Sequence, residues 1–178
     1  MIFETERLYV REMVQSDLQD LKEMLQDPEV MYAYEHIFDD ERTQKWLDRQ
    51  RQRYVDEGLG LWAVILKETG EMIGQSGVSM QKWGDIRVQE IGYLFKKEHW
   101  HKGYATEIAK GCKKYGFEVL NYDIVYSIIK YNNYASQNVA MRNGMKKLDE
   151  FVKYYNNTDM LHYVYGITRE EYEKESGN

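Results

Sequence analysis

The sequence of 178 residues, 43% of them hydrophobic, is long enough for a buried core and predicts one domain over residues 1–178. Its net charge of −6 disfavours non-specific binding to nucleic acid or to an anionic membrane, and it mildly favours a cationic partner such as an amine. No apolar run approaches membrane-spanning length, the first residues lack the apolar core of a signal peptide, and a single cysteine cannot form an internal disulfide, so we expect a cytoplasmic location.

The first third of the chain predicts a strand and two helices. Residues 7–11 alternate as in a strand, and Ser16 is placed to cap the first helix. A second helical tract runs over residues 40–56. The connector between the helices, residues 31–40, is both aromatic and acidic. It is either a lid or acceptor wall, or an aromatic plug that closes the core.

Strands dominate the middle of the chain. β-Rich runs cover residues 61–67, 72–80 and 86–95. Gly70 and Gly84 mark the turns between these runs, so we expect three antiparallel strands in succession.

A helix and a buried strand are predicted next. Small and apolar residues recur at helical spacing and form one narrow face: Ala105, Ile108, Ala109, Cys112, Gly116 and Val119. We interpret Cys112 as a core residue. The apolar run over residues 123–130 suits a buried strand, and the helical crossover makes it parallel to residues 86–95.

The last third predicts a short helix over residues 135–143 and two strands over residues 145–152 and 159–167. Together the elements describe a mixed α/β fold, in which a sheet is flanked by helices. The histidines show no spacing with cysteines or carboxylates that is typical of a metal site, so no metal is expected. They are His36, His99, His101 and His162.

The loop between residues 95 and 104 joins a strand to a helix. Such a loop leaves the first N–H groups of the helix without partners, and these favour a negative charge, most often a phosphate. The stretch EHWHKGYAT contains neither of the two common nucleotide-binding motifs. Taken alone, the pattern is more typical of a plain connection between a strand and a helix.

Two motifs resemble the GCN5-related N-acetyltransferase (GNAT) superfamily, and specifically its RimJ/RimL-type branch. EIGYLFKKEHWHKGYAT, residues 90–106, is similar to the family's strand followed by its Q/R-x-x-G-x-G/A acyl-CoA loop. NYASQNVAMRNGM, residues 133–145, resembles the branch's N-x-x-S-x-N-V-x-x-x-x-G-[FM] run. The resemblance covers nearly the whole chain. It implies a mostly antiparallel, twisted sheet of about seven strands, with one parallel pair splayed apart.

The resemblance also implies acetyl-CoA as the donor and a set of residues that hold it. The pantetheine would pair with backbone groups of Tyr93, Leu94 and Phe95 in the gap between the splayed strands. Asn133 would bridge the cofactor and the opened strand edge, while Asn138 either reaches the pantetheine or only solvates its helix. The diphosphate would rest on the N–H groups of His101, Lys102, Gly103, Tyr104, Ala105 and Thr106.

The implied chemistry needs a base, because an amine is protonated near neutral pH and must lose a proton before it attacks the thioester. Glu90, at the start of the gap, is our predicted general base, acting through water. The alternative interpretation is that Glu90 is only a solvated or paired carboxylate at the end of a strand. The backbone N–H of Leu94 or of Phe95 would stabilise the tetrahedral intermediate.

The expected acid for the leaving thiolate is missing. Many relatives carry a tyrosine seven residues after the motif asparagine, but Ala140 occupies that position here. Ser136 is our predicted replacement, and its alternative is a cap on the short helix. Tyr134 is a weaker candidate, and solvent can also protonate the thiolate.

The acceptor implied by the resemblance is a primary amine, either a protein N-terminus or a small amine such as a polyamine or an aminoglycoside. Residues 31–40 and the turn over residues 154–159 are predicted to build its pocket, because their aromatic and acidic content suits an ammonium group. The same residues suit a homodimer surface. A noncatalytic acyl-CoA-binding sensor is the alternative function, which Ala140 favours.

Overall fold

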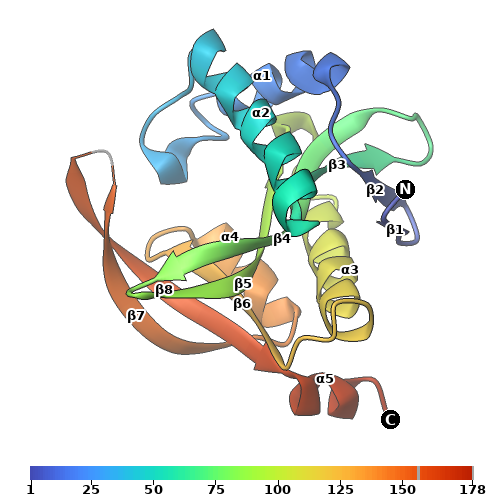
Figure 1. Cartoon of the computed structure of the whole chain (residues 1–178), viewed down its shortest axis with the longest axis vertical. Coiled ribbons are helices and arrows are strands. Elements are labelled where there is room, and N and C mark those ends of the chain that lie inside the picture. Colours follow the sequence, from blue (N-terminus) through green and yellow to red (C-terminus); the bar gives the residue numbers. More distant parts are fainter. Residues whose placement is uncertain (156, 178) are drawn as a thin grey trace.

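The computed structural model of the chain describes residues 1–155 and 157–177, in which one mixed sheet lies among five α-helices (Figure 1). The strands are β1 (Phe3–Glu4), β2 (Leu8–Arg11), β3 (Gly60–Leu66), β4 (Met72–Trp83), β5 (Ile86–Phe95), β6 (Ile124–Lys130), β7 (Lys146–Tyr155) and β8 (Thr158–Thr168). The α-helices are α1 (Leu18–Leu25), α2 (Asp40–Glu57), α3 (Tyr104–Glu118), α4 (Tyr134–Arg142) and α5 (Arg169–Glu175). Short 3-10 helices cover Gln15–Asp17, Tyr32–Tyr34 and Lys97–His99.

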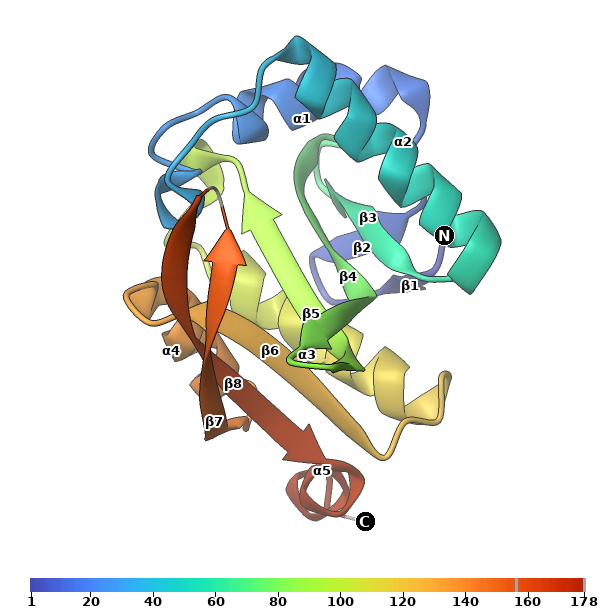
Figure 2. The ribbon, with the colours of Figure 1, turned by 60° about the vertical axis from the view of Figure 1, so that its left-hand side comes forward.

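The eight strands follow the order β1-β2-β3-β4-β5-β6-β8-β7. Every neighbouring pair is antiparallel except β5 and β6, which are parallel and diverge along their length (Figure 2). This confirms the predicted fold class, including the splayed parallel pair. The expected seven strands become eight because the two-residue strand β1 pairs with β2.

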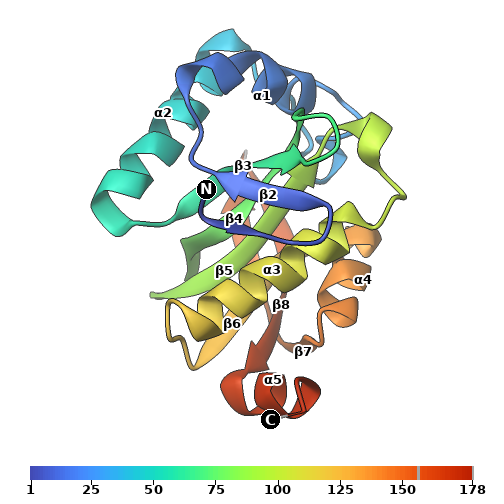
Figure 3. The same ribbon diagram turned by 90° about the vertical axis from the view of Figure 1, so that its right-hand side faces the viewer.

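Alternation along the strands sends side chains to two helical layers on opposite faces of the sheet. On β3, Ala63 and Ile65 pack with residues of α1 and α2, whereas Trp62 and Val64 pack with Ile108 of α3. Figure 3 shows α1 and α2 on one side of β2 and β3, and α3 on the other. The two faces of β5 therefore look toward different helices.

Two expectations about helix ends are wrong. Val119 follows the last residue of α3 and is 64% exposed, so it does not join the buried face that includes Cys112. Ser16 lies inside a 3-10 turn and does not cap α1. Asp17 is the N-cap residue of α1 but makes no side-chain cap there; its carboxylate accepts a hydrogen bond from the Val14 N–H at 2.8 Å, at the start of the 3-10 turn. Cys112 is fully buried, which confirms its assignment to the core.

A buried lysine fixes the end of β5. Lys96 follows the strand, is 3% exposed, and lies 2.8 Å from Asp20, 2.7 Å from Glu23 and 3.3 Å from Glu71. Burial lowers the pKa of Lys96, but the hydrogen bonds with Asp20 and Glu23 outweigh burial and the net shift is upward. The ammonium therefore stays charged and ties β5 to α1. Among the described helices, none combines the length and the apolar character that crossing a membrane requires.

Candidate functional site

The site begins at the gap between β5 and β6. The two strands pair at a single position, Glu90 opposite Tyr126. Beyond it β5 stays paired with β4 and β6 stays paired with β8, so the facing edges of β5 and β6 have no ladder between them in the described chain. The Ser127 hydroxyl donates to the Ile91 carbonyl at 3.0 Å and satisfies one group at the start of the gap.

The remaining backbone groups of β5 can be assigned to an edge. The Ile91 carbonyl faces β6, whereas the Lys96 N–H donates to Ile73 on β4 at 2.9 Å. Because successive residues of a strand direct their backbone groups to alternate edges, Tyr93 and Phe95 face the gap and Leu94 faces β4. Of the two N–H groups predicted to stabilise an oxyanion, that of Phe95 is the one directed into the gap.

The loop at the start of α3 leaves a row of N–H groups free. In the part of the chain that the structure describes, no acceptor contacts the backbone N–H of any residue from 101 to 106. Gly103, with φ of +80°, is the N-cap of α3 and provides no side-chain cap. His101 has φ of +60°, the left-handed region that histidine adopts more readily than most residues. The loop fits a diphosphate in both charge and shape.

Arg7 holds this loop in place from the β1–β2 turn. Its guanidinium donates to the Lys102 carbonyl at 2.9 Å, pairs with Glu107 at 2.7 Å and lies 4.5 Å from the Tyr104 ring centroid. The Lys102 side chain is exposed. Sequence reasoning missed Arg7 because its contacts span about a hundred residues of chain.

The short helix α4 borders the other side of the gap. The Asn133 side-chain oxygen accepts from the Ser136 N–H at 3.2 Å and from the Tyr32 hydroxyl at 2.8 Å. Asn133, not Ser136, therefore caps α4. The Ser136 carbonyl accepts from the Tyr93 hydroxyl at 2.9 Å, which fixes the wall of the gap.

Two positions bear on the missing acid. Ala140 is 2% exposed and belongs to the core, so no ionisable group takes the place of the tyrosine there. Tyr134 is 69% exposed. Ser136 is the half-buried hydroxyl of α4 that lines the site, and Asn138 lines it from the exposed face of the same helix.

One cavity of about 1000 Å³ joins the gap, the loop and the connector. Every predicted site residue except Lys102 lines it. The predicted acceptor wall contributes in part, through Met31, Tyr32, Ala33, Tyr34, Phe38 and Tyr155. Asn156, in the predicted turn, lies outside the described residues. Sequence reasoning missed the α2 residues that line this cavity, among them Trp46, Arg49 and Arg53.

Glu90 lies at the closed end of the gap. Burial in the cavity raises its pKa from 4.5 to about 7, although the charges of Lys153 and Arg53 and the Ile128 N–H act in the opposite direction. No cation lies within ion-pair distance of this carboxylate in the described chain. Tyr34 is close enough for the charge of Glu90 to add to the effect of burial, and the pKa of Tyr34 rises to about 12. Glu90 can therefore accept a proton near neutral pH.

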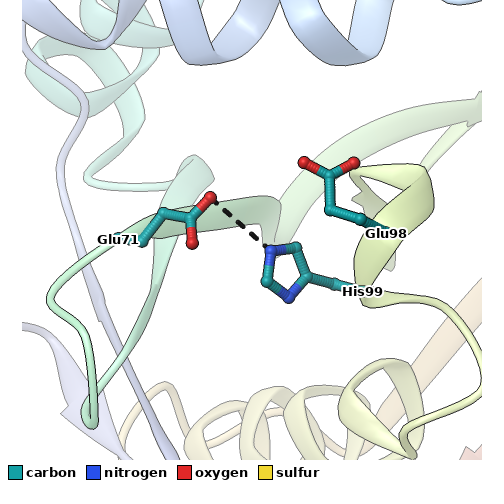
Figure 4. Close-up of side chains that lie close together, drawn as sticks. All are labelled: Glu71, Glu98 and His99. Carbon is teal, nitrogen blue, oxygen red and sulfur yellow. Dashed lines mark ion pairs between the residues drawn. The ribbon is translucent and has the colours of Figure 1, made fainter.

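A second group of ionisable residues lies near the loop. One ligand atom each of Glu71, Glu98 and His99 lies within 4.8 Å of the others (Figure 4). The same Glu71 oxygen lies 3.5 Å from His99 Nε2 and 3.3 Å from the Lys96 ammonium. Because Lys96 already neutralises Glu71, we assign no metal to this group.

The chain matches an acetyltransferase family in sequence and a member of that family in structure. Residues 7–146 match the family described as an acetyltransferase (GNAT) domain. The chain is 36% identical to the protein YkkB of Bacillus subtilis (strain 168) over 142 residues, 79% of this chain and 83% of YkkB. It is 28% identical to the uncharacterized N-acetyltransferase YnaD of the same strain over 171 residues, 94% and 97% of the two chains. A solved GNAT-family acetyltransferase from Bacillus anthracis shares the fold with a TM-score of 0.79 at 26% identity, covering 94% of this chain and 98% of that chain.

Proposed function

Because the chain belongs to the GNAT acetyltransferase family, we propose that it transfers an acetyl group from acetyl-CoA to a primary amine by direct attack in a ternary complex. The amine is either a protein N-terminus or a small amine. The observation that carries the proposal is the free row of N–H groups at residues 101–106, which adjoins an unpaired strand edge with Glu90 at its closed end. The single buried cysteine is consistent with a cytoplasmic enzyme.

The cofactor supplies an acetyl group already activated as a thioester, and this chain supplies its position. The free N–H groups of the loop and the positive end of the α3 dipole attract a diphosphate. The gap-facing backbone groups of Tyr93 pair with an extended amide chain as a missing strand would. The chain lying in the gap is thereby directed toward Glu90.

Glu90 removes the proton that keeps the amine unreactive. With a pKa of about 7, a large fraction of this carboxylate is ionised at neutral pH and is still basic enough to take a proton. The Phe95 N–H faces the gap, where it can donate to the acyl oxygen as negative charge develops there. Glu90 thus acts on the amine nucleophile, and the Phe95 N–H acts on the carbonyl that it attacks.

The leaving thiolate has two routes to a proton. The Ser136 side chain lines the cavity and can donate its hydroxyl proton. A thiol pKa of about 8.5 also makes the thiolate a tolerable leaving group that solvent can protonate. Ala140 is buried in the core and has no proton to donate to the thiolate, which supports Ser136 or solvent as the proton source.

The test is thiol release from acetyl-CoA with a panel of small amines and N-terminal peptides. We expect turnover with at least one amine, with a rate that rises through pH about 7. Glu90→Gln should lower kcat by about 100-fold, in the range found for general bases, and leave the affinity for acetyl-CoA unchanged. If acetyl-CoA binds and no amine turns over, the sensor module replaces the enzyme. An unaltered rate in Glu90→Gln removes Glu90 as the base.

A further inference from the structure

One side of the cavity is a row of cations on α2. Arg42, Lys45, Arg49 and Arg53 all line the cavity and recur at helical spacing. The neighbouring stripe of Thr43, Leu47 and Gln50 is buried against the sheet. The packing of the buried stripe therefore turns the cationic row toward the cavity.

Other elements add cations to the same space. Lys82 lines the cavity from β4 and Lys153 lines it from β7. Glu90 is the one carboxylate in the lining that the structure describes. The space around the predicted base is thus strongly cationic, although the molecule as a whole carries a net charge of −6.

The cations of the cavity lining differ in whether a neighbouring group already contacts them. Lys45 pairs with Glu41 at 2.6 Å, and Arg42 lies 4.6 Å from the Phe38 ring centroid. Among the described residues, no carboxylate lies within ion-pair distance of Arg49, Arg53 or Lys153.

The lack of an acidic partner has the largest effect on Arg53, because its side chain is partly buried. Burial lowers its pKa, and the charges of Arg49 and Arg87 act in the same direction, although the charge of Glu57 opposes them. A partly buried, unpaired guanidinium costs free energy, which an anion bound against it would offset.

The cationic row lies on the face of the sheet opposite to α3, the helix whose first loop fits the diphosphate. The loop that fits the diphosphate opens α3, whose residues pack with Trp62 and Val64 on one face of the sheet. α2 covers the opposite face, where Leu94 of β5 packs with Leu47 and Trp46. Glu90 lies two positions from Gly92 and four from Leu94, so strand alternation places its side chain on the α2 face. The charges of Arg53 and Lys153 act on this carboxylate.

We propose that the acceptor amine carries an anionic group, a carboxylate or a phosphate, which Arg49, Arg53 and Lys153 bind while the amine lies at Glu90. This inference rests on the acetyl transfer proposed above. Guanidinium groups bind both kinds of anion through paired hydrogen bonds, and they repel a second ammonium. A polyamine is therefore a poor acceptor, whereas an aminoalkyl phosphate or a peptide with an acidic second or third residue is a good one.

The experiment compares acceptors with and without an anionic group. One arm uses phosphoethanolamine against ethanolamine, and the other uses N-terminal peptides with Glu against Gln at the second position. Spermidine serves as the cationic extreme. We expect kcat/KM to be at least about 10-fold higher for the anionic member of one pair, since hydrogen bonds between charged groups are stronger than those between neutral groups. The arm that shows this preference identifies the source of the anion.

Variants locate the preference on α2. Arg53→Gln should raise KM for the anionic acceptor by about 10-fold and leave KM for its neutral partner and for acetyl-CoA unchanged. Arg51→Gln is the matched control, because Arg51 is an exposed arginine on the same helix that does not line the cavity, and it should change neither value. Equal melting temperatures of the two variants would show that both fold alike.

Two results would overturn the proposal. Neutral amines or spermidine could turn over as well as the anionic acceptors, or Arg53→Gln could raise KM equally for all acceptors. If no amine turns over, the proposed function fails separately. Calorimetric titration of the CoA-bound protein with phosphoethanolamine and with the acidic peptide then tests whether the cationic row binds an anion. Binding that Arg53→Gln abolishes supports anion recognition, and absence of binding refutes it.

Discussion

Glu90, the proposed base, links the proposed catalysis to stability. Its carboxylate is held away from bulk water, and burial raises its pKa from 4.5 to about 7. A raised pKa means that the folded protein binds this proton more tightly than the unfolded chain does. The stabilising contribution is therefore fully present below pH about 4.5 and is lost as pH rises through about 7.

Replacing Glu90 by Gln should consequently stabilise the protein at high pH. At pH 8 we expect the free energy of unfolding to rise by about 1–3 kcal/mol relative to the unmodified chain, from about 1.4 kcal/mol per pKa unit reduced by solvent in the cavity. At pH 4 the difference should vanish. Thermal unfolding between pH 4 and pH 8 measures it, with Glu68→Gln, an exposed carboxylate in the β3–β4 turn, as the control. A difference that does not depend on pH would contradict the assignment.

At the scale of single residues, the sequence predicted many of the residues that line the cavity but not the cations on α2. Glu90, Gly103 and Ser136 were identified because their motif fixes their place along the chain, and all three line the cavity. Arg53 was missed. A helix periodicity tells which residues share a face, but which face points to a cavity depends on the packing of α2 against β3 and β4.

The strand-loop-helix element depends on a turn that only some residues can make. Gly103 has φ of +80°, where a β-branched side chain is strained, and its ideal Cβ would lie 3.4 Å from the Arg7 guanidinium. Gly70, with φ of +73° and open space around it, has the same backbone conformation in a turn remote from the loop. Substitutions at Gly103 and Gly70 can therefore separate the effect of backbone strain on stability from its effect on ligand binding.

Gly103→Val should therefore weaken acetyl-CoA binding by about 10-fold or more, because the strained loop redirects the N–H groups that would hold the diphosphate. Gly70→Val should lose a similar stability, about 1–2 kcal/mol, and keep its affinity. Calorimetric titration with CoA and urea unfolding of both variants measure the two effects. Unchanged affinity in Gly103→Val would refute a diphosphate site at this loop.

Strands that follow from a local sequence pattern were predicted well, whereas features that depend on contacts between distant residues were not. Alternation and turn glycines located β3, β4 and β5 to within a few residues. The predicted face of α3 ran one residue past the helix, to Val119, and the predicted Ser16 cap of α1 was wrong because Asp17, held by Arg11 at 2.8 Å, is the residue that precedes α1. β8 lies between β6 and β7, and its pairing with β6 joins segments far apart in the sequence, which no local pattern predicts. The family resemblance anticipated the splayed pair of strands at the gap but not this strand order.

For the molecule as a whole, the gap persists because both of its strands are fixed from outside. β6 is held by β8 along its full length, and β5 is held by β4 and by Lys96 at its end. Lys96 is 3% exposed, whereas its partners Asp20 and Glu23 are partly open to solvent. Its removal would leave these carboxylates close together without the ammonium between them.

Lys96→Met should accordingly lower the free energy of unfolding by about 2–4 kcal/mol, as expected when one partner of a buried ion pair is removed. The matched control is Lys110→Met, an exposed lysine on α3 without an ion pair in the described chain, which should change stability by less than about 0.5 kcal/mol. Urea unfolding at pH 7 measures both. The double variant Lys96→Met/Glu23→Gln should recover part of the loss, because it removes one of the carboxylates that the lysine neutralised. Equal stability of Lys96→Met and Lys110→Met would mean that β5 is held by its pairing with β4 alone.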